Sequence, residues 1–398
     1  MPKDRPWSWV VALDGGGLDG RRGAAGLLRF DWPSKKIKFR FYDGISGGHN
    51  PSVSPSGKKI ILGNFSQTIL VVDADTLEPI ARQSMLAIEE TDDRLHSNTH
   101  HLWYDDRYFI GAVGKNLYKF DLENLSEPEK LGAHGMVVPH ELRWSSDHRY
   151  ILMGDIGPKY EKINQVGIFD LQTRKTKILA TPGTVWHVAA HPQKSLGYGI
   201  TYTYTVSNNR NYANRNLVPE LQREYILSID LADRKILDSW SCSADFPIHL
   251  VSDFALWADG EEEKLYAASG GSHTVVEVNA RDFSAPPRVI RIIPNWWHCF
   301  WSWRQRWRNI FESFSFGSIF NSSHLFIKAL LVSGWRVFDG VYSTRVSPDG
   351  KYLIAGNRGY NCLWVIDRKT FRPVYKKMLP VGPDGLHLGL HHSEIISL

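Results

Sequence analysis

The histidines of this chain occupy positions that suggest metal binding. The sequence contains 16 of them, and two hold matching places in a repeated pattern: His49 lies six residues before Pro55, and His140 lies six residues before Ser146. Neutral imidazoles that converge on one point bind iron, copper or zinc. Further imidazoles fall near the equivalent place in other repeats or close to the C-terminus, namely His100, His101, His187, His249, His387, His391 and His392.

The candidate metal ligands among these residues are His49, His101, His140, His187, His249 and His391. The alternative is that each is an ordinary polar residue held by water or by the backbone. His100, His187 and His249 are displaced by one to three residues from the place of His49, which a β-bulge would correct. Carboxylates nearby in the sequence would orient the imidazoles through hydrogen bonds, and the candidates are Glu141, Asp155, Asp253 and Glu394.

The elements that would position these side chains are copies of a short β-repeat. Residues 53–60 (Val-Ser-Pro-Ser-Gly-Lys-Lys-Ile) lead to Val-Val-Asp at 71–73, and residues 346–353 (Val-Ser-Pro-Asp-Gly-Lys-Tyr-Leu) lead to Val-Ile-Asp at 365–367. Each copy predicts strand, tight turn, strand, with proline at the first corner and glycine where φ is positive. Weaker copies, at a spacing of about 45 residues, begin near Trp103, Trp144, His191 and Trp257.

This period predicts an all-β protein, a seven-bladed β-propeller that forms a single domain over residues 1–398. Six copies lie between residues 48 and 376, so a six-bladed propeller is the alternative. Strands expected near residues 9–13, 27–31 and 386–398 would join the two ends of the chain in a seventh blade. Such closure removes exposed sheet edges and directs the innermost strands toward a central channel.

The Ser-Pro-Asp-Gly-Lys turn followed by Val-Ile-Asp resembles YVTN and WD40-like propeller repeats, and the resemblance extends over most of the chain. Histidines from several blades around one axial metal are similar to the site of the carotenoid-cleavage oxygenases. Those enzymes bind non-haem Fe(II) on a seven-bladed propeller, contact membranes through an apolar patch and place one ligand near the C-terminus. The resemblance implies ligands at His49, His140, His187 and either His391 or His392. Copper-using propellers of the selenium-binding, methanethiol-oxidase-like type are a second comparison.

An insertion at residues 294–334 separates the last two repeats. Its apolar residues recur at three- and four-residue steps, which predicts an amphipathic helix with very large side chains. Such a helix is typical of an anchor lying in the plane of a bilayer, or of an entry path for an apolar substrate. The alternatives are a cap packed on the blades and a protein-binding element. The residues of the apolar face include Trp296, Phe300, Trp303, Trp307 and Phe311.

Composition excludes several classes of protein. Hydrophobic residues make up 42% and charged residues 22% of the 398 residues, as in a globular protein with a core. The net charge of +5 comes from scattered basic residues, so no nucleic-acid partner is expected. Three cysteines, no signal-peptide pattern and no long apolar run predict a cytoplasmic protein, with peripheral membrane contact as a further expectation.

These features together predict a metal-dependent oxidoreductase of the non-haem Fe(II) oxygenase type that acts on a lipophilic small molecule. Copper or zinc would be alternative metals. A non-catalytic interaction scaffold is the first alternative function, and a metal-dependent lyase or hydrolase is the second.

Overall fold

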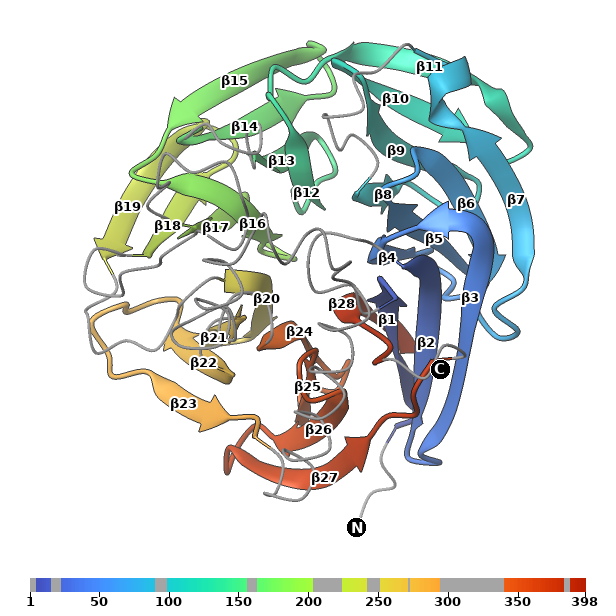
Figure 1. Cartoon of the computed structure of the whole chain (residues 1–398). Coiled ribbons are helices and arrows are strands. Elements are labelled where there is room, and N and C mark those ends of the chain that lie inside the picture. The colour runs from blue at the N-terminus through green and yellow to red at the C-terminus, as the bar shows by residue number, and fades with distance from the viewer. Residues whose placement is uncertain are drawn as a thin grey trace, which may run out of the picture.

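The computed structural model describes residues 5–15, 23–89, 99–155, 163–202, 224–241, 251–270, 273–293, 340–382 and 387–398. They form a β-propeller of seven four-stranded antiparallel sheets around a central axis (Figure 1). The prediction of a seven-bladed all-β fold is confirmed, and the six-bladed alternative is wrong. In the part of the chain just given, the only helical element is the 3-10 turn η1 (Met85–Ala87). The predicted tryptophan-rich helix at 294–334 lies outside the described residues.

Both ends of the chain contribute to one blade, as predicted. Its strands, from the axis outward, are β28 (Leu390–Ser397), β1 (Trp7–Leu13), β2 (Ala24–Trp32) and β3 (Lys36–Ser46). The C-terminal strand therefore lies at the channel, and Trp7 pairs with Ser397 at the end of the β1–β28 ladder. This pairing closes the ring and places β1 between β28 and β2, so both edges of β1 are hydrogen-bonded.

The other six blades follow in chain order, with the first strand of each at the axis. Three of them contain β4 (Gly48–Val53), β5 (Lys59–Asn64), β6 (Thr68–Asp73) and β7 (Pro79–Ser84); β8 (His101–Trp103), β9 (Tyr108–Val113), β10 (Asn116–Asp121) and β11 (Asn124–Ala133); and β12 (Pro139–Trp144), β13 (Tyr150–Asp155), β14 (Gln165–Asp170) and β15 (Lys175–Ala180). The remaining three contain β16 (Thr184–Ala190), β17 (Leu196–Tyr202), β18 (Tyr225–Asp230) and β19 (Lys235–Ser241); β20 (Val251–Asp259), β21 (Glu262–Ser269), β22 (Thr274–Asn279) and β23 (Arg288–Arg291); and β24 (Val341–Val346), β25 (Tyr352–Asn357), β26 (Cys362–Asp367) and β27 (Arg372–Met378).

The hydrophobic core is divided among the interfaces between neighbouring blades. Strand β1 illustrates the principle, because successive side chains point to opposite faces of a sheet. Trp9 and Val11 pack toward the blade of β24–β27, whereas Val10 and Ala12 pack toward the blade of β4–β7. All seven residues of β1 are buried. The middle strands are therefore apolar on both faces, which gives the sequence its short continuous hydrophobic runs.

The tight turns of the repeat join each innermost strand to the next strand at one end of the blades. Gly57 and Gly350 have φ values of +73° and +68°, and their N–H groups donate to the carbonyls of Ser54 and Ser347 at 2.8 Å. The positive φ predicted for these glycines is thus confirmed. At Gly350 a side chain is excluded for a second reason, since a Cβ there would overlap the ring of Trp257.

Candidate metal centre

Six of the seven innermost strands carry a β-bulge near the start of the strand. In β4, Gly48 pairs with Asn64 and Asn50 pairs with Gly63, so His49 is an additional residue in the ladder. A bulge bends the strand and redirects the extra side chain. The equivalent shifts fall around His140–Glu141 in β12, Trp186 in β16, Ser252 in β20, Tyr342 in β24 and His391–His392 in β28.

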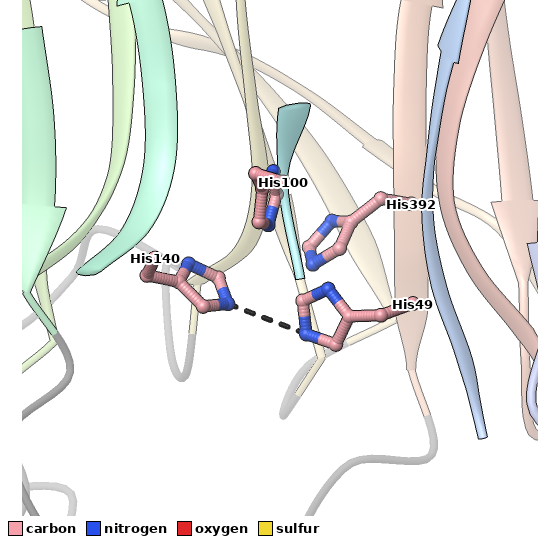
Figure 2. Close-up of side chains that lie close together, drawn as sticks. All are labelled: His49, His100, His140 and His392. Carbon is pink, nitrogen blue, oxygen red and sulfur yellow. Dashed lines mark hydrogen bonds between the residues drawn. The ribbon is translucent and has the colours of Figure 1, made fainter. Parts of the chain in front are cut away.

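Four of the histidines meet on the propeller axis. His49, His100, His140 and His392 are all buried, and each offers a ring nitrogen within 4.8 Å of the others (Figure 2). They come from four separate blades, on β4, immediately before β8, on β12 and on β28. Ring closure therefore gathers side chains that are up to 343 residues apart, since 392 − 49 = 343. The chemistry of this donor set suits a first-row transition metal.

The spacing of the ring nitrogens fits a shared ion. His49 Nε2 and His140 Nε2 lie 3.3 Å apart, the contact drawn as a dashed line in Figure 2. Two nitrogens bound to one tetrahedral ion would be separated by about 3.3 Å, given metal–nitrogen bonds of about 2.05 Å. His140 Nδ1 lies 3.0 Å from the carbonyl oxygen of Trp186, so its N–H donates there and Nε2 keeps the lone pair that a metal needs.

His100 supports the same interpretation. Its Nε2 is buried and has no hydrogen-bond partner among the described residues. Leaving a buried polar atom unsatisfied costs about 1–3 kcal/mol, and a bound ion would remove that cost. Burial, reinforced by the neighbouring imidazoles, lowers the pKa of His100 well below its usual value, and the same causes lower the pKa of His392. Both rings are therefore neutral at pH 7, the form that coordinates metal ions.

His187 lies beside this cluster with two partners of its own. Its ring centroid is 5.2 Å from that of His140 and 5.0 Å from that of His392. Its Nδ1 lies 3.1 Å from Glu141 Oε2. His187, His392 and Asp253 form a second buried group whose donor atoms all lie within 4.8 Å of one another.

A network of charged side chains adjoins the histidine cluster. Arg143 contacts Glu141 and lies 3.1 Å from Glu394, while Arg345 lies 3.2 Å from Glu394 and 2.7 Å from Asp253. Burial alone would raise the pKa of the Glu141 carboxyl, but Arg143 and His187 lower it to about 2. The carboxylates predicted to orient the imidazoles at Glu141, Asp253 and Glu394 thus lie in one ion-paired network that reaches His187 and His392.

The remaining candidate ligands are placed differently. His391 borders the cluster, with its ring centroid 4.2 Å from that of His49 and 4.9 Å from that of Tyr342. His101 instead packs against the core residue Phe109, at 5.9 Å between centroids, and burial lowers its pKa to about 3. Its neighbour in the sequence, His100, is the residue that joins the axial cluster. His249 and the predicted entry residues Trp296, Phe300, Trp303, Trp307 and Phe311 lie outside the described residues.

Asp155 bonds to the backbone next to the start of β12. Its two carboxylate oxygens accept the N–H groups of Val137 and Val138 at 2.8 and 2.9 Å, which fixes the chain just before β12. Sequence reasoning included His100 among the nearby imidazoles but did not choose it over His101. The only signal that separates the two is the pairing of His101 with Gly111, which is not visible in the sequence.

Comparison with known proteins supports the fold. No family model and no curated protein matches this sequence. Among solved structures, a putative 6-phosphogluconolactonase from Bacteroides fragilis aligns with a TM-score of 0.59 and 12% identity over 100% of this chain and 99% of its own. Hydrazine synthase from Kuenenia stuttgartiensis aligns at 0.57 and 12% identity, over 90% of this chain and 99% of its own. Dihydro-heme d1 dehydrogenase NirN, in complex with DHE, aligns at 0.53 and 11%, over 97% and 74%. Identities this low establish the propeller architecture and nothing finer.

In the described residues, no helix has the length and apolar character needed to span a bilayer.

Proposed function

We propose that this propeller holds a transition-metal ion on its axis through His49, His100, His140 and His392, and acts as a metal-dependent oxidoreductase of the non-haem Fe(II) oxygenase type. The observation that carries the proposal is the convergence of four buried imidazoles from four blades. The ion would supply Lewis acidity or redox chemistry at that point. Fe(II) is the metal we propose, and copper and zinc suit the same nitrogen donors.

The chain itself would hold the ligands in place and limit the access of water. The Trp186 carbonyl fixes the His140 ring, as described above. Aromatic side chains adjoin the cluster: Phe65 lies 5.0 Å from His49 and Tyr342 lies 4.9 Å from His391, between ring centroids. These apolar surfaces favour a lipophilic substrate over a strongly hydrated one.

Substrate or membrane contact would occur at the histidine-bearing end of the propeller. Within the blade of β20–β23, cross-strand pairs place Arg291 at the same end as Val251, the first residue of the innermost strand. Residues 294–334 lie between β23 and β24 in the sequence, and β24 begins with Val341, one residue before Tyr342. We propose that Trp296, Phe300, Trp303, Trp307 and Phe311 bind a bilayer surface or an apolar substrate at this end.

Elemental analysis of the purified protein tests the metal proposal. The wild type, and a His148→Ala control that changes an exposed histidine, should carry metal in stoichiometric amount after anaerobic incubation with Fe(II). His49→Ala and His140→Ala should each lose the ion of the four-histidine cluster and so carry less metal than the wild type. Metal content that is unchanged in both variants would remove these residues from the site, and a wild type without metal would favour the scaffold. Oxygen uptake by the loaded protein would separate an oxidoreductase from a lyase or hydrolase.

A further inference from the structure

We propose that the channel holds a second cation, bound by His187, His392 and Asp253, next to the ion at the four-histidine cluster. The inference rests on the proposed function, because the two sites share His392. When both ions are present, His49, His100 and His140 would hold the first, and His392 would belong to the second. The chain would then bind two ions, the first by three imidazoles and the second by two imidazoles and a carboxylate.

The three groups of the second site are already close enough for this role. Their donor atoms lie within 4.8 Å of one another, and all three residues are at most 2% exposed. Neighbouring donors on one ion are separated by about 3.0–3.4 Å, given bonds of about 2.1 Å. An inward movement of each donor atom by up to about 1 Å would therefore complete the site. Two histidines and one carboxylate leave open positions on the ion, and this donor set suits non-haem Fe(II).

His187 is oriented as a metal-binding histidine usually is. Glu141 Oε2 accepts the Nδ1–H of His187 at 3.1 Å and the N–H of Val188 at 3.0 Å. A carboxylate on Nδ1 fixes the tautomer and leaves the lone pair on Nε2, on the far side of the ring from Glu141. Arg143 in turn anchors Glu141. The ring is therefore held in position before any ion arrives, which reduces the entropic cost of binding.

Asp253 supplies the negative charge at this point. Its Oδ1 lies 3.8 Å from His392 Nδ1, and its carboxylate also accepts the N–H of Thr344 at 2.9 Å. Arg345 donates to both oxygens at 2.7 Å, so the carboxylate is held in a fixed position. Arg345 does not cancel the field of the network. The ion-paired network contains three carboxylates and two guanidinium groups, so its net charge is −1, which favours a cation. The carboxylates are those of Glu141, Asp253 and Glu394, and the guanidinium groups are those of Arg143 and Arg345.

His392 stands between the two sites. Its ring centroid lies 4.7 Å from that of His49 and 5.0 Å from that of His187. Each of its nitrogens thus has a different set of neighbours, since Nδ1 faces Asp253 while Figure 2 shows the other ring nitrogen directed toward His49. A side chain with this placement couples occupancy of one site to occupancy of the other.

Metal stoichiometry tests the inference directly. The full-length metal-free protein would be titrated with Co²⁺, and the bound ion measured both by elemental analysis and by its visible absorption. The wild type and the His148→Ala control should bind two equivalents, His187→Ala one, and His49→Ala fewer than the wild type. The absorption lost in His187→Ala should differ in shape from that lost in His49→Ala, because the two donor sets differ.

The possible failures are distinguishable. A wild type that binds one equivalent, retained in His187→Ala and lost in His49→Ala, would refute the second site and leave the proposed function intact. A wild type that binds no Co²⁺ would refute both. The wild-type stoichiometry separates one ion from two, and the variants of His187 and His49 show which residues hold each ion.

Discussion

Replacing Glu141 by glutamine tests whether the buried charges of the channel stabilise the propeller. The Glu141 carboxylate is 1% exposed and accepts hydrogen bonds from Val188 N–H and His187, as well as from Arg143. Glutamine has nearly the same shape but no charge, and its amide would direct N–H groups toward one of these donors. The substitution therefore leaves the volume unchanged and removes the ion pair.

The magnitude follows from the pKa of this carboxyl. It falls from 4.5 to about 2 on folding, and at 1.36 kcal/mol per pH unit the ionised form contributes about 3 kcal/mol of stability. Loss of one partner from a buried ion pair costs about 3–5 kcal/mol, a similar amount. Because the folded pKa is depressed, this stability is fully present above pH 4.5 and is lost as the pH falls toward 2. At pH 3 about 1 kcal/mol should remain.

The assay is thermal unfolding in the presence of a chelator, at pH 7 and at pH 3. An unfolding entropy of about 2.1 cal/mol/K per residue converts 3 kcal/mol into a Tm lowered by about 4 °C at pH 7 for a chain of 398 residues. Glu129→Gln is the matched control, because Glu129 pairs with Arg174 on the surface and both side chains are about half exposed; its change should be below about 0.5 kcal/mol. A Glu141→Gln Tm equal to that of the wild type, or a difference as large at pH 3 as at pH 7, would refute the reasoning.

Three further outcomes are expected. His101→Leu should leave metal content unchanged and make the protein less sensitive to acid. The folded wild-type ring has a pKa of about 3 and stays neutral, whereas the unfolded ring gains a proton below about pH 6.5, so the wild type loses stability as the pH falls from about 6.5 to 3. Urea titrations at several pH values would measure this loss. Gly350→Ala should lower the free energy of unfolding by about 3 kcal/mol, because the cost of a positive φ adds to the overlap with Trp257. Gly260→Ala has a positive φ but open space around it, so it should lower the free energy of unfolding by only about 1 kcal/mol. Equal costs in urea unfolding would contradict this account. Trp303→Ala with Trp307→Ala should reduce sedimentation with anionic liposomes several-fold relative to a Gln305→Ala control, and unchanged sedimentation would argue against membrane contact.

Much of the fold could be predicted because each repeat contains a recognisable tight-turn sequence. The two Ser-Pro-Ser/Asp-Gly-Lys turns follow β4 and β24 as expected, and the strands predicted near residues 9–13, 27–31 and 386–398 overlap β1, β2 and β28. The choice between six and seven blades depended on whether the chain ends pair with each other. That pairing is a contact between residues almost 400 positions apart, such as Trp7 and Ser397, and no local pattern specifies it.

The site could be predicted only in part, because side-chain direction in a strand reverses at every residue. The sequence pattern assigns His49 and His140 to matching positions of the repeat, and both lie in the axial cluster. His100 points into the channel, whereas the next residue, His101, points into the core, so an error of one residue in the predicted register selects the wrong histidine. In the six innermost strands that carry a bulge, the bulge changes the register by one residue without any fixed sequence signature. Sequence spacing therefore identifies the blade that supplies a ligand more securely than the ligand itself.

The bulges also explain why metal binding and ring closure depend on the same residues. A bulge near the start of β12 brings two consecutive side chains to the channel: His140 faces the imidazole cluster, and Glu141 bonds to the N–H of Val188 in the neighbouring blade. Asp253 of β20 likewise accepts the N–H of Thr344 in β24 of the neighbouring blade. These carboxylates hold neighbouring innermost strands together and also contact or lie near the imidazoles. A substitution that loosens one of these carboxylates should therefore lower metal affinity and thermal stability together. Loss of a metal-binding imidazole alone should lower metal affinity more than thermal stability.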